Sequence, residues 1–257
     1  MTPTSSVKNA KADKLEAVKS HLKQLRLTVM AAQLESILAL ARNRNHDALQ
    51  VVNSLCEFEV ESRWNNGVHR RLVQSKLTER PTIDQFDFAH HSSRQEQKAT
   101  ILSLVNLDFL AEKKDIILVG NPGTGKTMLA KILATAACHQ NRKVLVATAA
   151  DVVNHLAAAE ADSSLDKKIH VYQSPELLVC DELGYLPLGP IGSNLLFQIF
   201  SKRHKQGSTI VTTNLPFAEW GKVFDSTTIA AAIADRLVFN SEVIILGGPS
   251  YRRKLKQ

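Results

Sequence analysis

A glycine-rich pattern able to hold phosphate groups occupies residues 120–127 of this chain. It matches G-x-x-x-x-G-K-[ST] at every fixed position. In this pattern backbone N–H groups surround a di- or triphosphate, the lysine reaches the β- and γ-phosphates, and the hydroxyl binds Mg²⁺. We expect Lys126 to contact the phosphates and Thr127 to contact the metal. The predicted nucleotide site comprises Gly120, Asn121, Pro122, Gly123, Thr124, Gly125, Lys126, Thr127 and Met128.

The residues on either side of the pattern predict the elements that position it. Ile116–Val119 is a short apolar run typical of a buried strand, and apolar residues recur at helical spacing from Met128 to Ala136. A strand that leads through a glycine loop into a helix aims backbone N–H groups and the positive end of the helix dipole at one point. This arrangement favours a phosphate site over a chance match.

Two acidic residues end another apolar run and could complete the phosphate chemistry. Asp181 and Glu182 directly follow Leu177–Cys180. Phosphoryl transfer needs a Mg²⁺ ion that bridges the phosphates and a water molecule that is oriented for attack. We assign Asp181 to the Mg²⁺ shell and Glu182 to polarising the water.

A polar amide follows the β-branched run Thr209–Thr213. Asn214 could hold the γ-phosphate or the attacking water. The alternative is a turn-forming asparagine that ends a strand. The neighbouring acidic pair favours the catalytic interpretation.

From residue 95 onward the sequence alternates between strand and helix patterns. Five strands are predicted, at Ile116–Val119, Val144–Thr148, Leu177–Asp181, Thr209–Thr213 and Val243–Leu246. Such alternation favours an α/β domain with a parallel sheet covered by helices on both faces. We assign residues 95–257 to this domain.

The first third of the chain has a different organisation. Residues 1–13 are polar and predict a flexible lead-in, whereas apolar residues at helical spacing over 14–80 predict a small all-α domain. Arg80-Pro81 ends that pattern, because the residue before a proline avoids the helical region. Residues 81–94 then predict an extended linker, with the rings of Phe86 and Phe88 holding it to the next domain.

The net charge of +7 and an isoelectric point near 9.3 indicate a moderate basic excess. Clusters of basic residues suit binding to nucleic-acid phosphates, although a surface that is merely solvated is an equal alternative. The candidate DNA contacts are Arg70, Arg71, Lys76, Arg80, Arg253 and Lys254.

The amino-acid composition also indicates which cellular compartment to expect. No run of 18 apolar residues is present, so we expect no membrane span. Three cysteines far apart in the sequence predict neither a disulfide framework nor a zinc site, which favours the cytoplasm.

Longer segments around these residues resemble the IstB family of AAA+ ATPases, the helper proteins encoded beside the transposase of a bacterial insertion-sequence family. The resemblance is carried by residues 180–188 (CDELGYLPL), 194–198 (NLLFQ), 207–220 (GSTIVTTNLPFAEW) and 233–237 (IADRL). It also includes 148–151 (TAAD), Phe86-Asp87-Phe88 and Trp64.

The resemblance implies roles for individual positions. Residues 120–127 would be Walker A, Asp181-Glu182 Walker B, and Asn214 sensor 1. Arg236 would be an arginine finger that enters the site of a neighbouring subunit, with Arg203 as the competing candidate. Arg252 would be the sensor-2 arginine in its own subunit.

The family resemblance further implies ATP and Mg²⁺ as ligands. It implies a homo-oligomer that forms with ATP on duplex DNA and stimulates a cognate transposase. Phe239 and Asn240 replace histidines common in relatives, and the chain after Asn214 is too short for a full helical lid. We therefore expect a reduced or absent lid.

Three other functions stay open. A helicase loader of the DnaC type shares the ATPase core and would use its N-terminal helices to bind a helicase. A small-molecule or nucleotide kinase would turn over as a monomer, unaffected by DNA. A non-hydrolysing, ATP-gated scaffold would function without Glu182.

Overall fold

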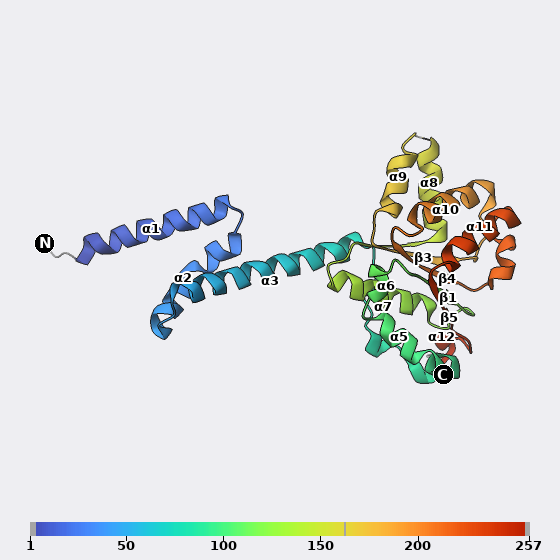
Figure 1. Cartoon of the computed structure of the whole chain (residues 1–257), viewed down its shortest axis with the longest axis horizontal. Coiled ribbons are helices and arrows are strands. Elements are labelled where there is room, and N and C mark those ends of the chain that lie inside the picture. The colour runs from blue at the N-terminus through green and yellow to red at the C-terminus, as the bar shows by residue number, and fades with distance from the viewer. Residues whose placement is uncertain (1–3, 162, 255–257) are drawn as a thin grey trace. The chain divides into compact units, whose positions relative to one another are not determined.

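The computed structural model describes the backbone of residues 4–161 and 163–254 and the side chains of residues 13–160 and 163–252. Contacts divide the chain into two compact units, residues 1–69 and 70–257 (Figure 1). The division lies inside a helix, α3 (Ala48–Gln74), and not at residue 80 as the sequence pattern suggested. Residues 70–94 therefore group with the second unit.

The first unit is helical. It contains α1 (Thr4–Gln24), α2 (Thr28–Arg44) and most of α3. Its core is small, with Leu34, Ile37 and Leu55 as the buried apolar cluster. The buried carboxylate of Glu59 accepts hydrogen bonds from the backbone N–H groups of Val29 (2.9 Å) and Met30 (3.1 Å), which satisfies donors at the start of α2.

Two predictions for the N-terminal third are wrong. Residues 4–13 belong to α1 and are not a flexible lead-in, because no glycine or proline interrupts the sequence from Thr4 to Gln24. Residues 81–94 are not an extended linker, since they form η1 (Ile83–Gln85), η2 (Phe88–His90) and most of α4 (Ser92–Glu96). Phe86, within this segment, is buried.

A five-stranded parallel sheet organises the second unit, as predicted. Its spatial order is β2-β3-β4-β1-β5, and every pair is parallel. The central order β3-β4-β1 brings the carboxyl ends of three strands to neighbouring positions, which is where α/β sheets bind ligands. The strands are β1 (Asp115–Val119), β2 (Val144–Thr148), β3 (Leu177–Leu183), β4 (Ser208–Thr213) and β5 (Ser241–Ile245).

Helices cover the sheet on both faces. Helix α7 (Lys126–His139) packs on β2, β3 and β4, whereas α8 (Ala149–Ala161), α9 (Leu165–Gln173), α10 (Gly189–Arg203) and α11 (Thr227–Val238) enclose the larger apolar core of the unit. The shorter helices are α5 (Lys98–Leu104), α6 (Asp108–Ala111), η3 (Phe217–Lys222) and α12 (Tyr251–Lys254).

Within the described residues the four-residue α12 follows the last strand. No helix in the described part of the chain combines the length and apolar character that a membrane crossing needs.

Arg203 is a structural cation at the end of α10. Its guanidinium is 1% exposed and donates to the backbone carbonyls of Tyr172, Gln173, Pro175 and Ser208. Burial lowers the pKa of Arg203 to about 10, with the charge of Asp115 opposing that shift. Burial also raises the pKa of Asp115 to about 7, although its carboxylate accepts a hydrogen bond from Thr209 N–H (2.6 Å).

Replacing Arg203 should destabilise the second unit rather than alter one reaction step. Arg203→Met leaves four buried carbonyls without their donor, and we expect the free energy of unfolding to fall by roughly 3–5 kcal/mol. Denaturant titration followed by Trp220 fluorescence in a Trp64→Phe background measures this, because these are the two tryptophans of the chain. Lys202→Met, at the exposed neighbouring cation, is the control and should change stability by less than about 0.5 kcal/mol. Equal effects of the two substitutions would contradict the structural role.

Candidate functional site

The glycine-rich loop joins β1 to α7 at the carboxyl edge of the sheet. Gly123 (φ 82°) and Gly125 (φ 99°) adopt left-handed conformations that other residues rarely take. A Cβ atom on Gly125 would lie 2.8 Å from Nη2 of Arg94, so the position has no room for a side chain. Helix α7 begins directly after Gly125, which leaves the first N–H groups of the helix directed at the loop.

Lys126 is held inside this loop. Its ammonium group donates to the carbonyls of Gly120 (2.7 Å) and Asn121 (2.9 Å), and its side chain is buried. Burial lowers the pKa of Lys126, while the nearby carboxylate of Asp181 opposes that shift. A phosphate group would supply the missing negative charge at this position.

Asp181 lies beside Thr127, and these are the two residues that the sequence analysis assigns to Mg²⁺. The Thr127 hydroxyl donates to Oδ1 of Asp181 over 3.0 Å, and the Thr212 hydroxyl on β4 donates to the same oxygen. Asp181 is buried at the end of β3. A hydroxyl and a carboxylate at this spacing fit one side of a Mg²⁺ shell that takes its remaining ligands from phosphate oxygens and water.

Glu182 occupies a strained and exposed position next to Asp181. Its φ of 61° is in the left-handed region, and the β3–β4 register shifts between Cys180 and Leu183. The Glu182 N–H donates to the Thr212 hydroxyl (2.9 Å) in place of a ladder bond. Bulges of this kind re-aim a side chain next to active sites, and here the carboxylate leaves the sheet and lines the cavity.

Asn214 follows β4 directly, one strand from Asp181. Among the described residues its Oδ1 atom is buried and has no hydrogen-bond partner. Buried polar atoms are normally paired, so an orphan at this edge indicates a missing ligand or water.

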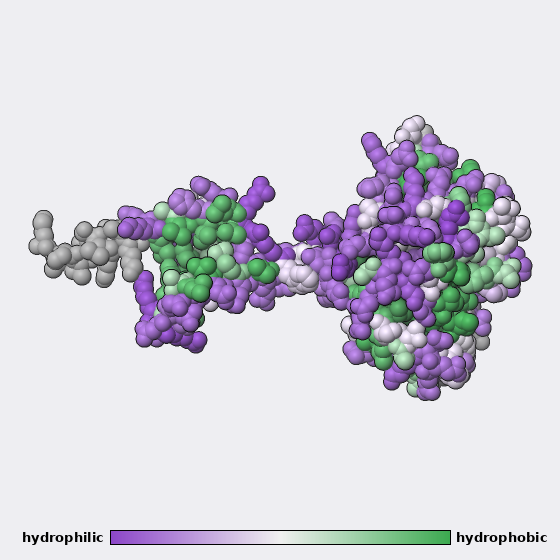
Figure 2. Space-filling model, in the orientation of Figure 1, coloured by the Kyte–Doolittle hydropathy of each residue, from purple (hydrophilic) through white to green (hydrophobic). Residues whose placement is uncertain are grey.

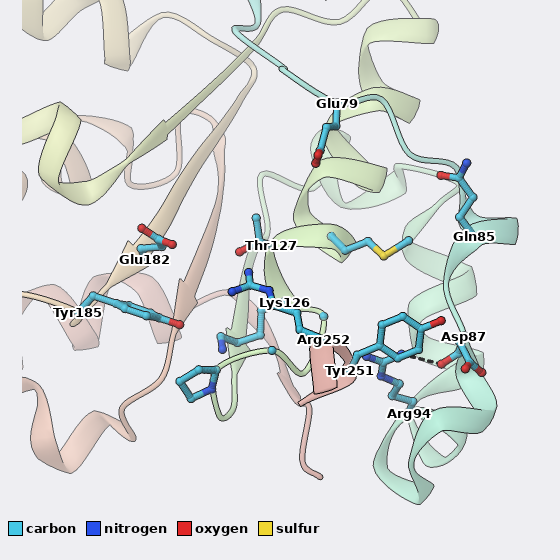
Figure 3. Close-up of a pocket in the computed structure, with 14 residues that line it drawn as sticks. Glu79, Gln85, Asp87, Arg94, Lys126, Thr127, Glu182, Tyr185, Tyr251 and Arg252 are labelled. Atoms are coloured by element: carbon cyan, nitrogen blue, oxygen red, sulfur yellow. Dashed lines mark hydrogen bonds between the residues drawn. The ribbon is translucent and has the colours of Figure 1, made fainter. Parts of the chain in front are cut away.

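Lys126, Thr127 and Glu182 line a cavity of about 490 Å³ (Figure 3), whereas Asp181 and Asn214 are not among its lining residues. Lys126, Thr127, Met128, Glu182 and Arg252 line it together with residues that the sequence analysis did not assign to the site. A second cavity of about 540 Å³ adjoins it over Met128 and Thr127. The additional residues are Glu79, Gln85, Asp87, Arg94, Tyr185 and Tyr251.

Arg94 is the most consequential of these additional residues. Arg94 is 3% exposed. Its guanidinium donates to the carbonyls of Thr124 and Asp87, and each donor–acceptor distance is 2.7 Å. It also lies over the rings of Phe86 (4.6 Å) and Tyr251 (5.4 Å). Arg94 therefore joins three segments far apart in the sequence. No local pattern indicates this, because the contacts depend on the tertiary arrangement.

The C-terminal segment closes the other side of the loop. Tyr251 N–H donates to the Gly123 carbonyl (2.9 Å), and the His90 ring hydrogen bonds to the Pro249 carbonyl (3.0 Å). These contacts hold Arg252 at the cavity, where its exposed side chain is one of the lining groups. Arg252 therefore lies beside the phosphate loop of its own chain.

Arg236 and Arg203, the two finger candidates, occupy opposite environments. Arg236 on α11 is partly exposed, donates to the Ala232 carbonyl (2.8 Å) and lies over the Phe197 ring (4.8 Å). It does not line the cavity of its own chain. Arg203 is buried and fully engaged, so it cannot extend to another subunit.

The basic residues predicted to contact DNA differ in their exposure and contacts. Arg70 and Lys76 are exposed, Arg71 is half-buried and donates to the Asn141 carbonyl (3.1 Å), and Arg80 lines the second cavity. The side chains of Arg253 and Lys254 lie outside the described residues.

Comparison with solved structures identifies the fold. The DnaC helicase loader matches with a TM-score of 0.53 and 22% identity, covering 61% of this chain and 91% of that chain. AMPPCP-bound DnaA from Aquifex aeolicus matches with a TM-score of 0.57 and 17% identity, covering 70% of this chain and 56% of that chain. At these identities the likeness establishes an AAA+ P-loop fold and nothing finer.

Comparison of sequences is more specific and confirms the resemblance stated above. The chain is 34% identical over 242 residues to the ATP-binding protein of insertion sequence IS5376 from Geobacillus stearothermophilus, with 94% and 96% of the two chains covered. It is 30% identical over 236 residues to the ATP-binding protein of insertion sequence IS21 from Pseudomonas aeruginosa, with 92% and 88% covered. The family model described as IstB-like ATP binding protein matches residues 20–257. The chain therefore belongs to the family of IstB-like ATP-binding proteins of insertion sequences.

Proposed function

We propose that this protein is a Mg²⁺-dependent ATPase that assembles on duplex DNA in the cytoplasm and stimulates integration by a cognate transposase. The observation that carries the ATPase proposal is the convergence of Lys126, Thr127 and Glu182 on one cavity. Asp181 is hydrogen-bonded to Thr127, and Asn214 lies at the adjacent strand end. The insertion-sequence relatives support the transposition context.

Each residue has a distinct task in this proposal. Lys126 and the loop N–H groups hold the β- and γ-phosphates, and Thr127 and Asp181 hold Mg²⁺, which neutralises charge on the phosphate oxygens. Glu182 orients the attacking water and accepts its proton, since its carboxylate faces the cavity. Asn214 positions the water or the γ-phosphate with its amide. Arg252 contacts the phosphate from within the same chain.

The final cation comes from a neighbouring copy in this proposal. Arg94 and Arg252 are the arginines that line the cavity among the described residues, and Arg94 is already bonded to two carbonyls. Arg236 lies partly exposed and away from the cavity of its own chain, which suits a group that acts across a subunit boundary. Hydrolysis would then depend on assembly, and ATP would promote the assembled state on DNA.

Two other functions are separated from this one by experiment. A helicase loader would bind a replicative helicase, whereas the proposed function requires a strand-transfer assay in which the protein, ATP and duplex target raise integration by the cognate transposase. Absence of that stimulation, with capture of a helicase, would favour the loader. A kinase would phosphorylate a small acceptor as a monomer without any response to DNA.

Glu182→Gln should separate ATP binding from hydrolysis. The amide keeps the size of the side chain but cannot accept a proton, so we expect hydrolysis to fall by at least about 100-fold while the ATP dissociation constant changes by less than about threefold. Steady-state phosphate release and fluorescent-nucleotide titration measure the two quantities. Glu219→Gln, at a partly exposed carboxylate on η3, is the control. Full function of Glu182→Gln in the integration assay would instead indicate a non-hydrolysing scaffold.

Mixing two inactive variants should restore hydrolysis if Arg236 acts on a neighbour. Arg236→Ala lacks the finger but has an intact pocket, and Lys126→Ala has the reverse defect. We expect each alone to lose about 10³-fold in rate and an equal mixture to recover about a quarter of the wild-type rate for random mixing. The double variant Lys126→Ala/Arg236→Ala mixed with Arg236→Ala should recover nothing. Activity of Arg236→Ala alone would remove the finger assignment.

DNA binding should be weakened by salt, and the basic residues Arg70 and Lys76 should carry part of that dependence. Arg70→Ala/Lys76→Ala removes two exposed cations, so we expect the slope of log K against log salt to fall in magnitude by about 2. Fluorescence anisotropy of a labelled duplex with ATP and Mg²⁺ measures this slope. The control pair Arg142→Ala/Lys222→Ala also removes two exposed cations and should leave the slope unchanged. Equal slopes for the two pairs would place the contacts elsewhere.

A further inference from the structure

Tyr185 lines the nucleotide cavity, and the proposed reaction assigns it no task. It lies three residues after Glu182, in the segment that joins β3 to α10. Figure 2 shows apolar residues at several places on the surface of the second unit, so the exposure of a ring alone does not mark a site. What sets Tyr185 apart is a hydroxyl group at the edge of a phosphate site.

Two residues with positive φ turn the chain between β3 and Tyr185. They are Glu182 (φ 61°) and Gly184 (φ 99°). A Cβ atom on Gly184 would lie 3.3 Å from Oγ1 of Thr213 and 3.5 Å from Oδ1 of Asn214, so the turn packs closely against the end of β4. The Tyr185 N–H donates to the Glu182 carbonyl over 3.4 Å. The backbone of Tyr185 is therefore held next to the residues assigned to the attacking water.

The side chain of Tyr185 lies at the acidic end of the cavity. In Figure 3 Tyr185 and Glu182 are on one side of Lys126, whereas Asp87 and Arg94 are on the opposite side. The Tyr185 ring extends toward Lys126, with the hydroxyl at its tip. Because the loop lysine reaches the β- and γ-phosphates and Glu182 faces the attacking water, this end of the cavity suits the terminal phosphate.

The Tyr185 hydroxyl is available to a ligand. Within the described part of the chain it makes no hydrogen bond, and the residue is 43% exposed. Partial burial and the carboxylates of Glu182 and Asp181 raise the pKa of the phenol, while the charge of Arg252 opposes that shift. The phenol therefore stays protonated at neutral pH. It can donate a hydrogen bond to an anionic oxygen but cannot act as a base.

Tyr185 also borders a second and much smaller cavity. This cavity has a volume of about 50 Å³ and lies beside the start of α8, where Ala149 and Ala150 line it. Glu182 and Leu186 line it as well. A space of this size exceeds that of one water molecule, so the ring is not tightly packed on this side. Tyr185 can therefore adjust its position when a ligand enters the nucleotide cavity.

Other roles fit the position of Tyr185 less well. A ring that stacks on the base of a nucleotide would lie at the end of the cavity away from Glu182. A structural tyrosine is usually buried with its hydroxyl hydrogen-bonded. Tyr172 is of that kind, since it is 2% exposed and its hydroxyl hydrogen bonds to His155 over 2.8 Å.

We propose that the Tyr185 hydroxyl donates a hydrogen bond to an oxygen of the terminal phosphate and makes the site selective for a nucleoside triphosphate over a diphosphate. The contact rests on the proposed ATPase function and adds a group to the same site. ADP has no γ-phosphate, so the contact forms only with the triphosphate. Residues 184–188 are then held at Tyr185, and the neighbouring Leu186, 65% exposed, takes a position that depends on the nucleotide.

Removal of one oxygen atom tests the assignment. Full-length Tyr185→Phe keeps the ring, and displacement of a fluorescent nucleotide with Mg²⁺ present gives the dissociation constants of ADP and of AMPPCP, a triphosphate analogue that resists hydrolysis. We expect the ratio of the ADP constant to the AMPPCP constant to fall at least about tenfold, because a hydrogen bond to a charged group is lost. The ADP constant itself should change by less than about twofold.

Tyr172→Phe is the matched control. It removes a buried hydroxyl that is hydrogen-bonded to His155, so it should lower the thermal midpoint of the nucleotide-free protein and leave the ratio within about twofold of wild type. Tyr185→Phe should do the reverse, with a lower ratio and an unchanged thermal midpoint. Equal ratios in Tyr185→Phe and wild type would overturn the assignment.

Amide hydrogen exchange tests the response of the surrounding segment. In the wild-type protein AMPPCP should slow exchange of residues 184–188 by at least about threefold relative to ADP, and Tyr185→Phe should remove that difference. Equal exchange with the two nucleotides in the wild-type protein would contradict a contact between this segment and the terminal phosphate.

Failure of the ATPase proposal would give a different result. A wild-type protein that binds neither nucleotide would remove the nucleotide site and the role of Tyr185 with it. A wild-type protein that binds both nucleotides with equal constants, or with a ratio that Tyr185→Phe leaves unchanged, would overturn only the role of Tyr185.

Discussion

The carboxylate of Asp181 is the point at which the elements of the nucleotide site are joined. Hydroxyl groups from Thr127 on α7 and Thr212 on β4 both donate to it, so the phosphate loop, the acidic strand and the strand before Asn214 share one hydrogen-bonded centre. This is possible because β4 lies between β3 and β1 in the sheet. The same Thr212 hydroxyl accepts from the Glu182 N–H and stabilises the bulge that turns the Glu182 carboxylate toward the cavity.

The phosphate loop is held from behind by residues distant in the chain. Arg94 binds the Thr124 carbonyl, and the backbone of Tyr251 binds the Gly123 carbonyl. The Arg94 guanidinium lies over the Tyr251 ring, so the two supports contact one another as well as the loop. Because both supports bind carbonyl groups, neither of them occupies an N–H group of the loop. The last described segment forms one wall of the cavity through Tyr251 and Arg252.

The boundary between the two compact units, after residue 69, differs from the boundary at residue 80 that the sequence pattern predicts. The residues of the nucleotide site all belong to the second unit. Three of them, Gln85, Asp87 and Arg94, lie within residues 81–94, which the sequence pattern predicted to be a linker. The first unit has a small apolar core formed by Leu34, Ile37 and Leu55.

Much of this molecule follows from sequence because its signals are local. Each of these signals involves residues that are close together in the sequence. The signals are the glycine pattern, the apolar runs that end in Asp181-Glu182 and in Asn214, and the short segments with strand or helix patterns. They predicted the P-loop fold, the family, and the nearness of Thr127 to Asp181. The helical start of the chain was missed because a polar composition alone does not exclude a helix that lacks glycine and proline.

The tertiary structure decided the roles of individual residues, and the arginines show the physical reason. Arg203 and Arg236 are both arginines on helices, and no local pattern separates a guanidinium that binds four buried carbonyls from one that is partly exposed. Arg94 likewise became part of the site through Thr124 and Tyr251, which lie far along the chain. Sequence by itself determined which chemistry the chain carries, whereas burial and long-range hydrogen bonds, which exist only after folding, decided which of its cations are structural and which remain free to act.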